Sequence, residues 1–219
     1  MAKVVVIVSG GMDSATLLYD VVKQGHEVYA LSFDYGQRHR RELDCANKLC
    51  ERTNVPHKIL NLSILNEIAS SSQTRKDIAV PHGRYDEENM KLTVVPNRNM
   101  VMLSLAIAYA IGIKATRVYY GAHSGDHAIY PDCRRDFVYN MNQAAMTCDW
   151  HHVEALAPYL GMDKGDIAIR GKELHVPYEL TWSCYEGKEV PCGKCGACTE
   201  RAEAFAKAGI PDPLIKVSP

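Results

Sequence analysis

The chain has 219 residues, of which 47% are hydrophobic and 23% are charged, and its formal net charge at pH 7 is -1. These are ordinary values for a globular protein, and they exclude a disordered, fibrous or collagen-like chain. Because the charges nearly balance, no global attraction to nucleic acid or to a membrane surface is expected. The longest apolar run, residues 100–113, is shorter than the roughly 20 residues that a membrane span requires, so we expect a buried helix there.

The amino terminus carries no recognisable secretory signal. Its uninterrupted apolar run covers only residues 4–8, whereas the apolar part of such a signal has about 7–15 residues. We therefore expect a cytoplasmic protein, in which a disulfide framework built from the eight cysteines is disfavoured.

Strands and helices alternate along the first third of the chain. A β-branched run at residues 3–8 predicts a strand buried on both faces, and the helical pattern at 13–24 ends at Gly25. The alternation continues with a strand, a helix and a strand at residues 28–33, 37–52 and 57–62. This order predicts an α/β fold with an open, mostly parallel sheet flanked by helices.

The polar stretch at residues 70–90 is too long for a routine connection, and we expect a flexible excursion or lid. Regular structure then resumes with a helix, a strand and three further helices, at residues 98–113, 117–121, 134–147, 163–174 and 199–207. We expect residues 1–175 to form the α/β domain and residues 176–219 to form a cysteine-rich segment packed on it.

The segment from Ser9 to Ser14, SGGMDS, lies directly between the first strand and the first helix. Two glycines allow a tight turn and a close backbone approach, and the helix N-terminus favours an anion. Hydroxyls of Ser9 and Ser14 add donors, and Asp13 suits a magnesium ion beside phosphate oxygens. A glycine turn that simply caps the helix is the alternative. Neither G-x-x-x-x-G-K-[ST] nor G-x-G-x-x-G occurs, which disfavours kinase-like or dinucleotide-binding functions.

Four of the cysteines crowd into fifteen residues in the tail, at Cys184, Cys192, Cys195 and Cys198. Four thiolates fill a tetrahedral zinc shell, so we predict one structural zinc ion per chain. An iron–sulfur cluster is the main rival, although the x3-C-P continuation of bacterial ferredoxins is missing, and disulfides are a third possibility. The other four cysteines are scattered and read as buried small apolar residues.

SGGMDS resembles the pyrophosphate loop, S-G-G-x-D-S, of the ATP pyrophosphatase (PP-loop) superfamily. Further motifs make the resemblance more specific: Asp34 to His39 (DYGQRH), Pro96 to Asn99 (PNRN), Tyr130 to Arg134 (YPDCR) and Thr181 to Tyr185 (TWSCY). Together they resemble the 7-cyano-7-deazaguanine synthase (QueC-type) family over residues 3–208. Asn97 stands where that family usually has glycine, and we expect the turn to survive because Asn tolerates left-handed backbone.

The resemblance implies an adenine nucleotide alpha hydrolase-like, Rossmann-like fold and an ATP-dependent synthesis of a nitrile. ATP with Mg²⁺ would activate the carboxylate of 7-carboxy-7-deazaguanine, ammonia would give an amide, and a second ATP would activate the amide oxygen. It also implies a homodimer and no nucleic-acid partner.

The same resemblance, weighed with the residues themselves, assigns site residues. Nucleotide contacts are expected from Val8, Ser9, Gly10, Gly11, Met12, Asp13, Ser14, Ala15, Thr16, Leu17 and Leu18. Catalytic roles are expected for Asp13, Ser14, Arg98 and Lys164, although Arg98 and Lys164 could each be a surface charge. Substrate contacts are expected from Gln37, Arg38, Asp126, Tyr130, Asp132 and Arg134, with either aspartate as an acceptor for the base or as a turn residue.

Two other functions compete. A PP-loop enzyme that thiolates or otherwise modifies tRNA generally needs an RNA-binding extension or a catalytic cysteine pair, whereas this sequence has a near-neutral charge and we expect no spare domain in it. A zinc-ribbon module that binds nucleic acid would show a basic excess around the cysteines, but residues 184–201 carry three glutamates against two lysines and one arginine. Both are therefore disfavoured.

Overall fold

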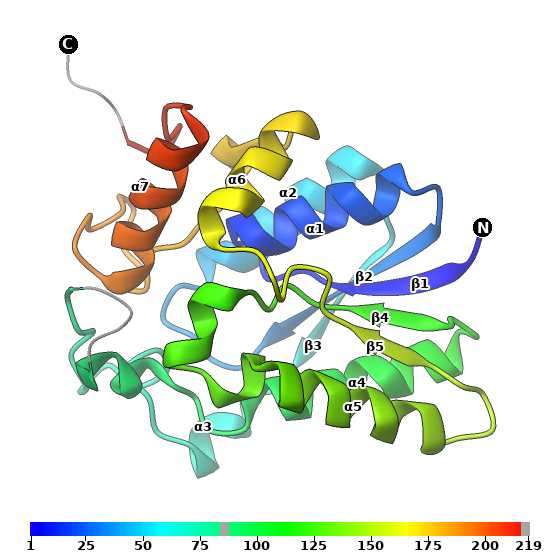
Figure 1. Cartoon of the computed structure of the whole chain (residues 1–219). Helices are drawn as coiled ribbons and strands as arrows, with labels where there is room; N and C mark the ends of the chain where they lie inside the picture. Colours follow the sequence, from blue (N-terminus) through cyan, green and yellow to red (C-terminus); the bar gives the residue numbers. More distant parts are fainter. Residues whose placement is uncertain (84–87, 216–219) are drawn as a thin grey trace.

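The computed structural model describes residues 1–83 and 88–215. Five parallel strands form one sheet in the order β3–β2–β1–β4–β5 (Figure 1). The strands are β1 (Lys3–Ile7), β2 (Glu27–Asp34), β3 (His57–Asn61), β4 (Arg117–Tyr119) and β5 (Glu154–Leu156). The predicted open parallel sheet is thus confirmed.

Helices cover both faces of this sheet (Figure 1). On one face lie α1 (Met12–Lys23), α2 (Arg41–Thr53), α6 (Lys164–Glu173) and α7 (Gly196–Ala208). On the other lie α4 (Arg98–Gly112) and α5 (Arg135–Thr147), with the short α3 (Leu65–Ile68) beside them. In β1, Val4 and Val6 pack toward the first layer and Val5 toward the second, and all three are fully buried. A strand covered on both faces is apolar throughout because neither side meets water.

Four 3₁₀ segments complete the described structure: η1 (Glu88–Thr93), η2 (Ser124–Ala128), η3 (Pro131–Cys133) and η4 (Tyr178–Leu180). The tail does not form a separate layer. Ala204 and Phe205 of α7 join the core built by α1, α2 and α6.

Some boundaries differ from the sequence prediction. The second helix begins at Arg41 and not at residue 37, because Gln37 folds back into a turn: its side-chain oxygen accepts from Tyr35 N at 2.9 Å. The last helix begins at Gly196, three residues before the predicted 199, with Cys195 as its N-cap. Strand β5 was missed, because its sequence Glu-Ala-Leu carries no strand pattern and only its pairing with β4 defines it.

The backbone at Asn97 is left-handed, with φ of 60°, as expected for the residue that replaces glycine there. Asn97 is the N-cap of α4. The turn before this helix therefore keeps its conformation.

The polar stretch after α3 is anchored in its described part. Ser71, Ser72 and Gln73 are buried, and the Arg38 guanidinium donates to the carbonyls of Ser72 and Ile78 at 3.3 and 3.0 Å. Buried polar side chains and two bonds from one arginine tie residues 70–83 to the body, contrary to the expected excursion. Residues 84–87 of the predicted lid lie outside the described residues.

By length and composition alone, Met90–Gly112 could cross a membrane. Its α4 part packs against the sheet through Met102, Leu103, Ala106, Ile107 and Ala110, all buried. This is the pattern of a core helix, as expected from the sequence.

Candidate active site

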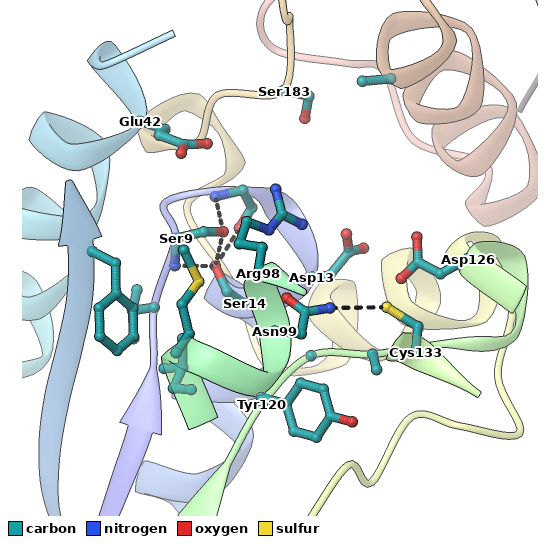
Figure 2. Close-up of a pocket in the computed structure, with 18 of the residues that line it drawn as sticks. Ser9, Asp13, Ser14, Glu42, Arg98, Asn99, Tyr120, Asp126, Cys133 and Ser183 are labelled. Carbon is teal, nitrogen blue, oxygen red and sulfur yellow. Dashed lines mark hydrogen bonds between the residues drawn. The ribbon is translucent and has the colours of Figure 1, made fainter. Parts of the chain in front are cut away.

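The strand order reverses between β1 and β4, where the chain leaves β1 toward β2 on one side and β4 toward β5 on the other. In open parallel sheets such a switch point opens a crevice beyond the carboxyl ends of the strands. A cavity of about 220 Å³ lies here, lined from the loops after β1, β2 and β4, from the start of α4 and from the tail (Figure 2).

The loop after β1 is held closed by its own serines. The Ser14 hydroxyl oxygen accepts from the backbone N–H groups of Ser9 and Gly10 at 3.1 and 3.2 Å (Figure 2). Ser14 Oγ in turn donates to the carbonyl of Gly11 at 3.1 Å. The two hydroxyls predicted as ligand donors thus organise the loop, while the first-turn N–H groups of α1 keep no helical partner and remain suited to an anion.

Gly10 is required by its surroundings. Its φ is +93°, and a Cβ there would lie 1.9 Å from the carbonyl oxygen of Glu42 in α2. On the other side, Trp182 N donates to the Gly10 carbonyl at 2.9 Å. The loop is therefore pressed between α2 and the tail, which fixes its position.

Charged groups surround the lysine at the start of α6. Lys164 Nζ lies 2.6 Å from Glu200 Oε2 and 3.4 Å from Asp13 Oδ2. Burial alone would lower the pKa of the Lys164 ammonium, but the nearby carboxylates outweigh it and raise that pKa above its ordinary value. Lys164 therefore stays positively charged beside the loop.

His123 and Asp126 complete this cluster. His123 Nε2 lies 3.8 Å from Asp13 Oδ2 and 3.5 Å from Asp126 Oδ2. Figure 2 shows Asp13 and Asp126 on facing sides of the same space. Three carboxylates, counting Glu200, thus gather around one lysine.

Arg98 enters the cavity from the first turn of α4. Its Nη1 donates to Tyr35 Oη and to Gln73 Oε1, both at 3.2 Å, and its guanidinium lies over the Tyr35 ring at 5.5 Å from the centroid. Burial raises the pKa of Tyr35, so its hydroxyl keeps its proton and donates to Gln73 Oε1. An arginine held this way is a fixed positive charge facing the cavity.

The eleven predicted nucleotide residues divide into two groups. The cavity is lined by Val8, Ser9, Gly11, Met12, Asp13 and Ser14. Gly10, Ala15, Thr16, Leu17 and Leu18 do not line it and are buried behind the loop. Among the predicted catalytic residues, Asp13, Ser14, Arg98 and Lys164 all line the cavity. Their contact with a nucleotide stays a prediction.

Of the six predicted substrate residues, the structure brings only Asp126 to the cavity wall. Asp132 accepts from Asn99 N at 3.1 Å and so caps the start of α4, and Arg134 is exposed and donates to the His127 carbonyl. Arg38 ties down the polar stretch, Gln37 folds into its turn, and the Tyr130 hydroxyl lies 2.7 Å from Thr93 Oγ1. Substrate contacts of these five stay predictions without support from their placement.

The cavity also contains residues that sequence reasoning did not assign. They include Tyr35, Glu42, Gln73, Asn99, Tyr120, Cys133, Trp182, Ser183 and Tyr185. Several lie inside or beside the quoted motifs, and this position was the only feature of the sequence that could have assigned them to the site. Gln73 lies in the polar stretch, outside these motifs, and nothing in the sequence indicated that it belongs to the site.

Four buried polar atoms without a hydrogen-bond partner belong to residues that line this one cavity. They are Asp13 Oδ1, His39 Nδ1, Gln73 Nε2 and Tyr120 Oη, half of the eight such side-chain atoms among the described residues. Buried polar groups normally have partners, so these four indicate a polar ligand.

The four clustered cysteines come together as predicted. Their sulfur atoms all lie within 4.8 Å of one another, close to the about 3.8 Å expected between sulfurs 2.3 Å from a tetrahedral zinc ion. Cys192 N and Cys195 N donate to the sulfurs of Cys184 and Cys192 at 3.3 Å. Four converging sulfurs, two of which accept backbone N–H groups, fit a thiolate metal site.

The family described as "Queuosine biosynthesis protein QueC" matches residues 3–209. The chain belongs to this family. It is 61% identical to the 7-cyano-7-deazaguanine synthase of Methanoregula boonei over 97% of this chain and 98% of that protein. It is 55% identical to the enzyme of the same name from Caldicellulosiruptor saccharolyticus, over 97% and 94%. The resemblance drawn from the motifs is confirmed.

Among solved structures, the NMN synthetase of Francisella tularensis is similar with a TM-score of 0.51 and 15% identity, over 95% of this chain and 77% of that one. A 4-thiouridine synthetase, solved in complex with RNA and ATP, has a TM-score of 0.54 and 16% identity, over 95% and 50%. At such identities the likeness shows the fold alone, and it agrees with the predicted open α/β fold.

Proposed function

We propose that this protein is an ATP-dependent carbon–nitrogen ligase that converts 7-carboxy-7-deazaguanine and ammonia into 7-cyano-7-deazaguanine in queuosine biosynthesis. The observation that carries the proposal is the family match over nearly the whole chain, with relatives named 7-cyano-7-deazaguanine synthase. The switch-point cavity, with the N-terminus of α1 in its wall and its unpartnered polar atoms, supports it.

In the proposed first half, a carboxylate oxygen attacks the α-phosphorus of ATP, an oxygen–phosphorus bond forms, and pyrophosphate leaves. The first-turn N–H groups of α1 and the Lys164 ammonium bind the phosphates and stabilise the charge that develops on pyrophosphate. Arg98, held by Tyr35 and Gln73, orients the carboxylate or the α-phosphate from the opposite wall. Ammonia then attacks the acyl carbon, AMP leaves with the oxygen, and the nitrogen loses a proton to give the amide.

In the second half the amide oxygen attacks a second ATP, and loss of AMP leaves the nitrile. A nitrile retains neither carboxylate oxygen, so each oxygen must leave as an activated ester. The loop type favours adenylate over phosphate activation. Enclosure between α2, α4 and the tail would keep water from the activated esters.

Two metal ions are part of the proposal. Mg²⁺ would arrive with ATP and would be held by Asp13, whose Oδ1 is buried and has no partner. A zinc ion at the four cysteines would be structural, because four thiolates leave no open position for substrate. We further propose, from the resemblance alone, that the protein is cytoplasmic and forms a homodimer. Light scattering on the purified protein tests the dimer.

The decisive experiment is a time course with ATP, the deazaguanine acid and nitrogen-15 ammonia. Mass spectrometry should show one labelled nitrogen first in the amide and then in the nitrile, with AMP and pyrophosphate formed at each step. Limiting ATP should make the amide accumulate. Label absent from every deazaguanine product, with only tRNA modified in a mixed extract, would replace this proposal with the tRNA-modifying alternative.

A further inference from the structure

A buried carboxylate–imidazole pair lies in the cavity wall and has no part in the steps above. Glu42 stands in the first turn of α2, and His39 stands three residues earlier in the turn that follows β2. Glu42 Oε2 lies 3.3 Å from His39 Nε2, and the two side chains are 11% and 3% exposed. Both residues line the cavity, and Figure 2 shows Glu42 on its α2 side, facing the segment of Ser183.

The pair has a defined orientation. Glu42 Oε1 accepts from Gln37 Nε2 at 3.1 Å, which leaves Oε2 to face the imidazole. The His39 ring also packs against the Tyr185 ring, with centroids 5.3 Å apart. Because the carboxylate can only accept, the proton of a neutral imidazole is assigned to Nε2, and Nδ1 carries the free lone pair.

That lone pair has no partner in the described structure: His39 Nδ1 is buried and accepts no hydrogen bond. A histidine acts as a general base when a carboxylate holds one of its ring nitrogens and the other nitrogen is free to accept a proton. His39 and Glu42 have this arrangement.

The pair also lies beside the loop that follows β1. The carbonyl of Glu42 would lie only 1.9 Å from a Cβ at Gly10, so the first turn of α2 is in direct contact with the phosphate loop. Trp182, which bonds to the other side of Gly10, and Tyr185, which packs on His39, both come from the tail. The buried imidazole thus packs on the tail, and Glu42, which holds it, comes from the turn of α2 that contacts the loop.

We propose that His39, held by Glu42, is the general base of the nitrile-forming step. This inference rests on the proposed function. O-adenylation of the amide gives a cation with two N–H bonds, and the first proton is acidic enough to pass to water, leaving a neutral imidate. In the next step His39 Nδ1 takes the remaining N–H proton, those electrons form the third carbon–nitrogen bond, the carbon–oxygen bond breaks, and AMP leaves.

Nitrile formation needs a positioned base more than amide formation does. The ammonium formed when ammonia adds to the acyl carbon is itself a strong enough acid to lose its proton to solvent. The imidate N–H is neutral and far less acidic, so its removal needs a positioned base. Glu42 would stabilise the imidazolium until the proton passes to water after the products leave.

The test measures the two halves separately, with full-length protein. His39→Asn should lower the rate of nitrile formation from supplied amide and ATP by about 10²- to 10⁴-fold, while amide formation from the acid changes less than the nitrile step, so that amide accumulates. Glu42→Gln should slow the same step, and added imidazole should restore it in His39→Ala. His151→Asn is the matched control, since His151 bonds to the Ala115 carbonyl at the other end of β4 and should leave both halves unchanged.

Two results would overturn the inference. One is a nitrile step in His39→Asn as fast as in the wild type. The other is an equal loss in both halves without rescue by imidazole, which would make the pair a support for α2. If His39→Asn does not fold, Glu42→Gln decides by the same comparison. A wild-type protein that forms neither amide nor nitrile would instead show that the proposed function is wrong, and the inference would fall with it.

Discussion

Replacing Gly10 by alanine tests whether the phosphate loop is held in place by its neighbours. Gly10 has φ of +93°, and its added Cβ would lie 1.9 Å from the Glu42 carbonyl oxygen and 3.0 Å from Ala46 N. Both are backbone atoms of α2, so neither can swing away as a flexible side chain would. Either the loop or the helix must move.

The cost has two parts, which a matched variant separates. The left-handed backbone costs an alanine about 1–2 kcal/mol. The forced shift of packed backbone adds about 1–3 kcal/mol. Gly25 has φ of +77° with nothing within 4 Å of its Cβ, so Gly25→Ala should show the first part alone. At about 2–4 °C per kcal/mol for a chain of this size, the Gly10 variant should melt several degrees below the Gly25 variant.

Guanidinium unfolding with saturating zinc measures the free energy of unfolding of each variant. Pyrophosphate release, at a temperature where both variants are folded, measures their activity. We expect Gly10→Ala to lose most of its activity and Gly25→Ala to keep it. Equal destabilisation of the two variants, with activity retained in both, would refute the argument that α2 fixes the loop.

Three further outcomes are expected. Asp13→Ala should abolish turnover at saturating ATP while the protein still folds and keeps its zinc, and a near-normal kcat would mean that Asp13 serves only as a residue of the helix start. Elemental analysis of protein purified without added metal should find one zinc per chain, whereas iron with a visible absorption band, or no metal, would contradict the four-thiolate zinc site. Of the four scattered cysteines expected to be buried, Cys148 is exposed, so iodoacetamide at pH 7.5 should label Cys148 but not Cys50 or Cys133 in the native protein. Burial raises the pKa of Cys50 to about 12 and that of Cys133 further, so both stay protonated, and peptide mapping that finds Cys133 labelled as fast as Cys148 would contradict this.

Local patterns were enough to predict the framework of this protein. The β-branched run of β1, the SGGMDS segment and the close cysteine spacing each act over a few neighbouring residues, and each formed the expected structure. The parallel sheet followed because strands and helices alternate with short connections. Asn97 could be predicted for the same reason, since its backbone conformation depends on the residue itself.

The composition of the cavity depended on contacts between residues far apart in sequence. Lys164 meets Glu200 across 36 positions, and Arg98 meets Gln73 across 25. Asp132, a candidate acceptor for the base or a turn residue, accepts from Asn99 N at the start of α4, a contact across 33 positions that the sequence could not show. The role of a side chain depends on which residues the fold places next to it. A single sequence shows the chemistry of the side chain but not which residues those are.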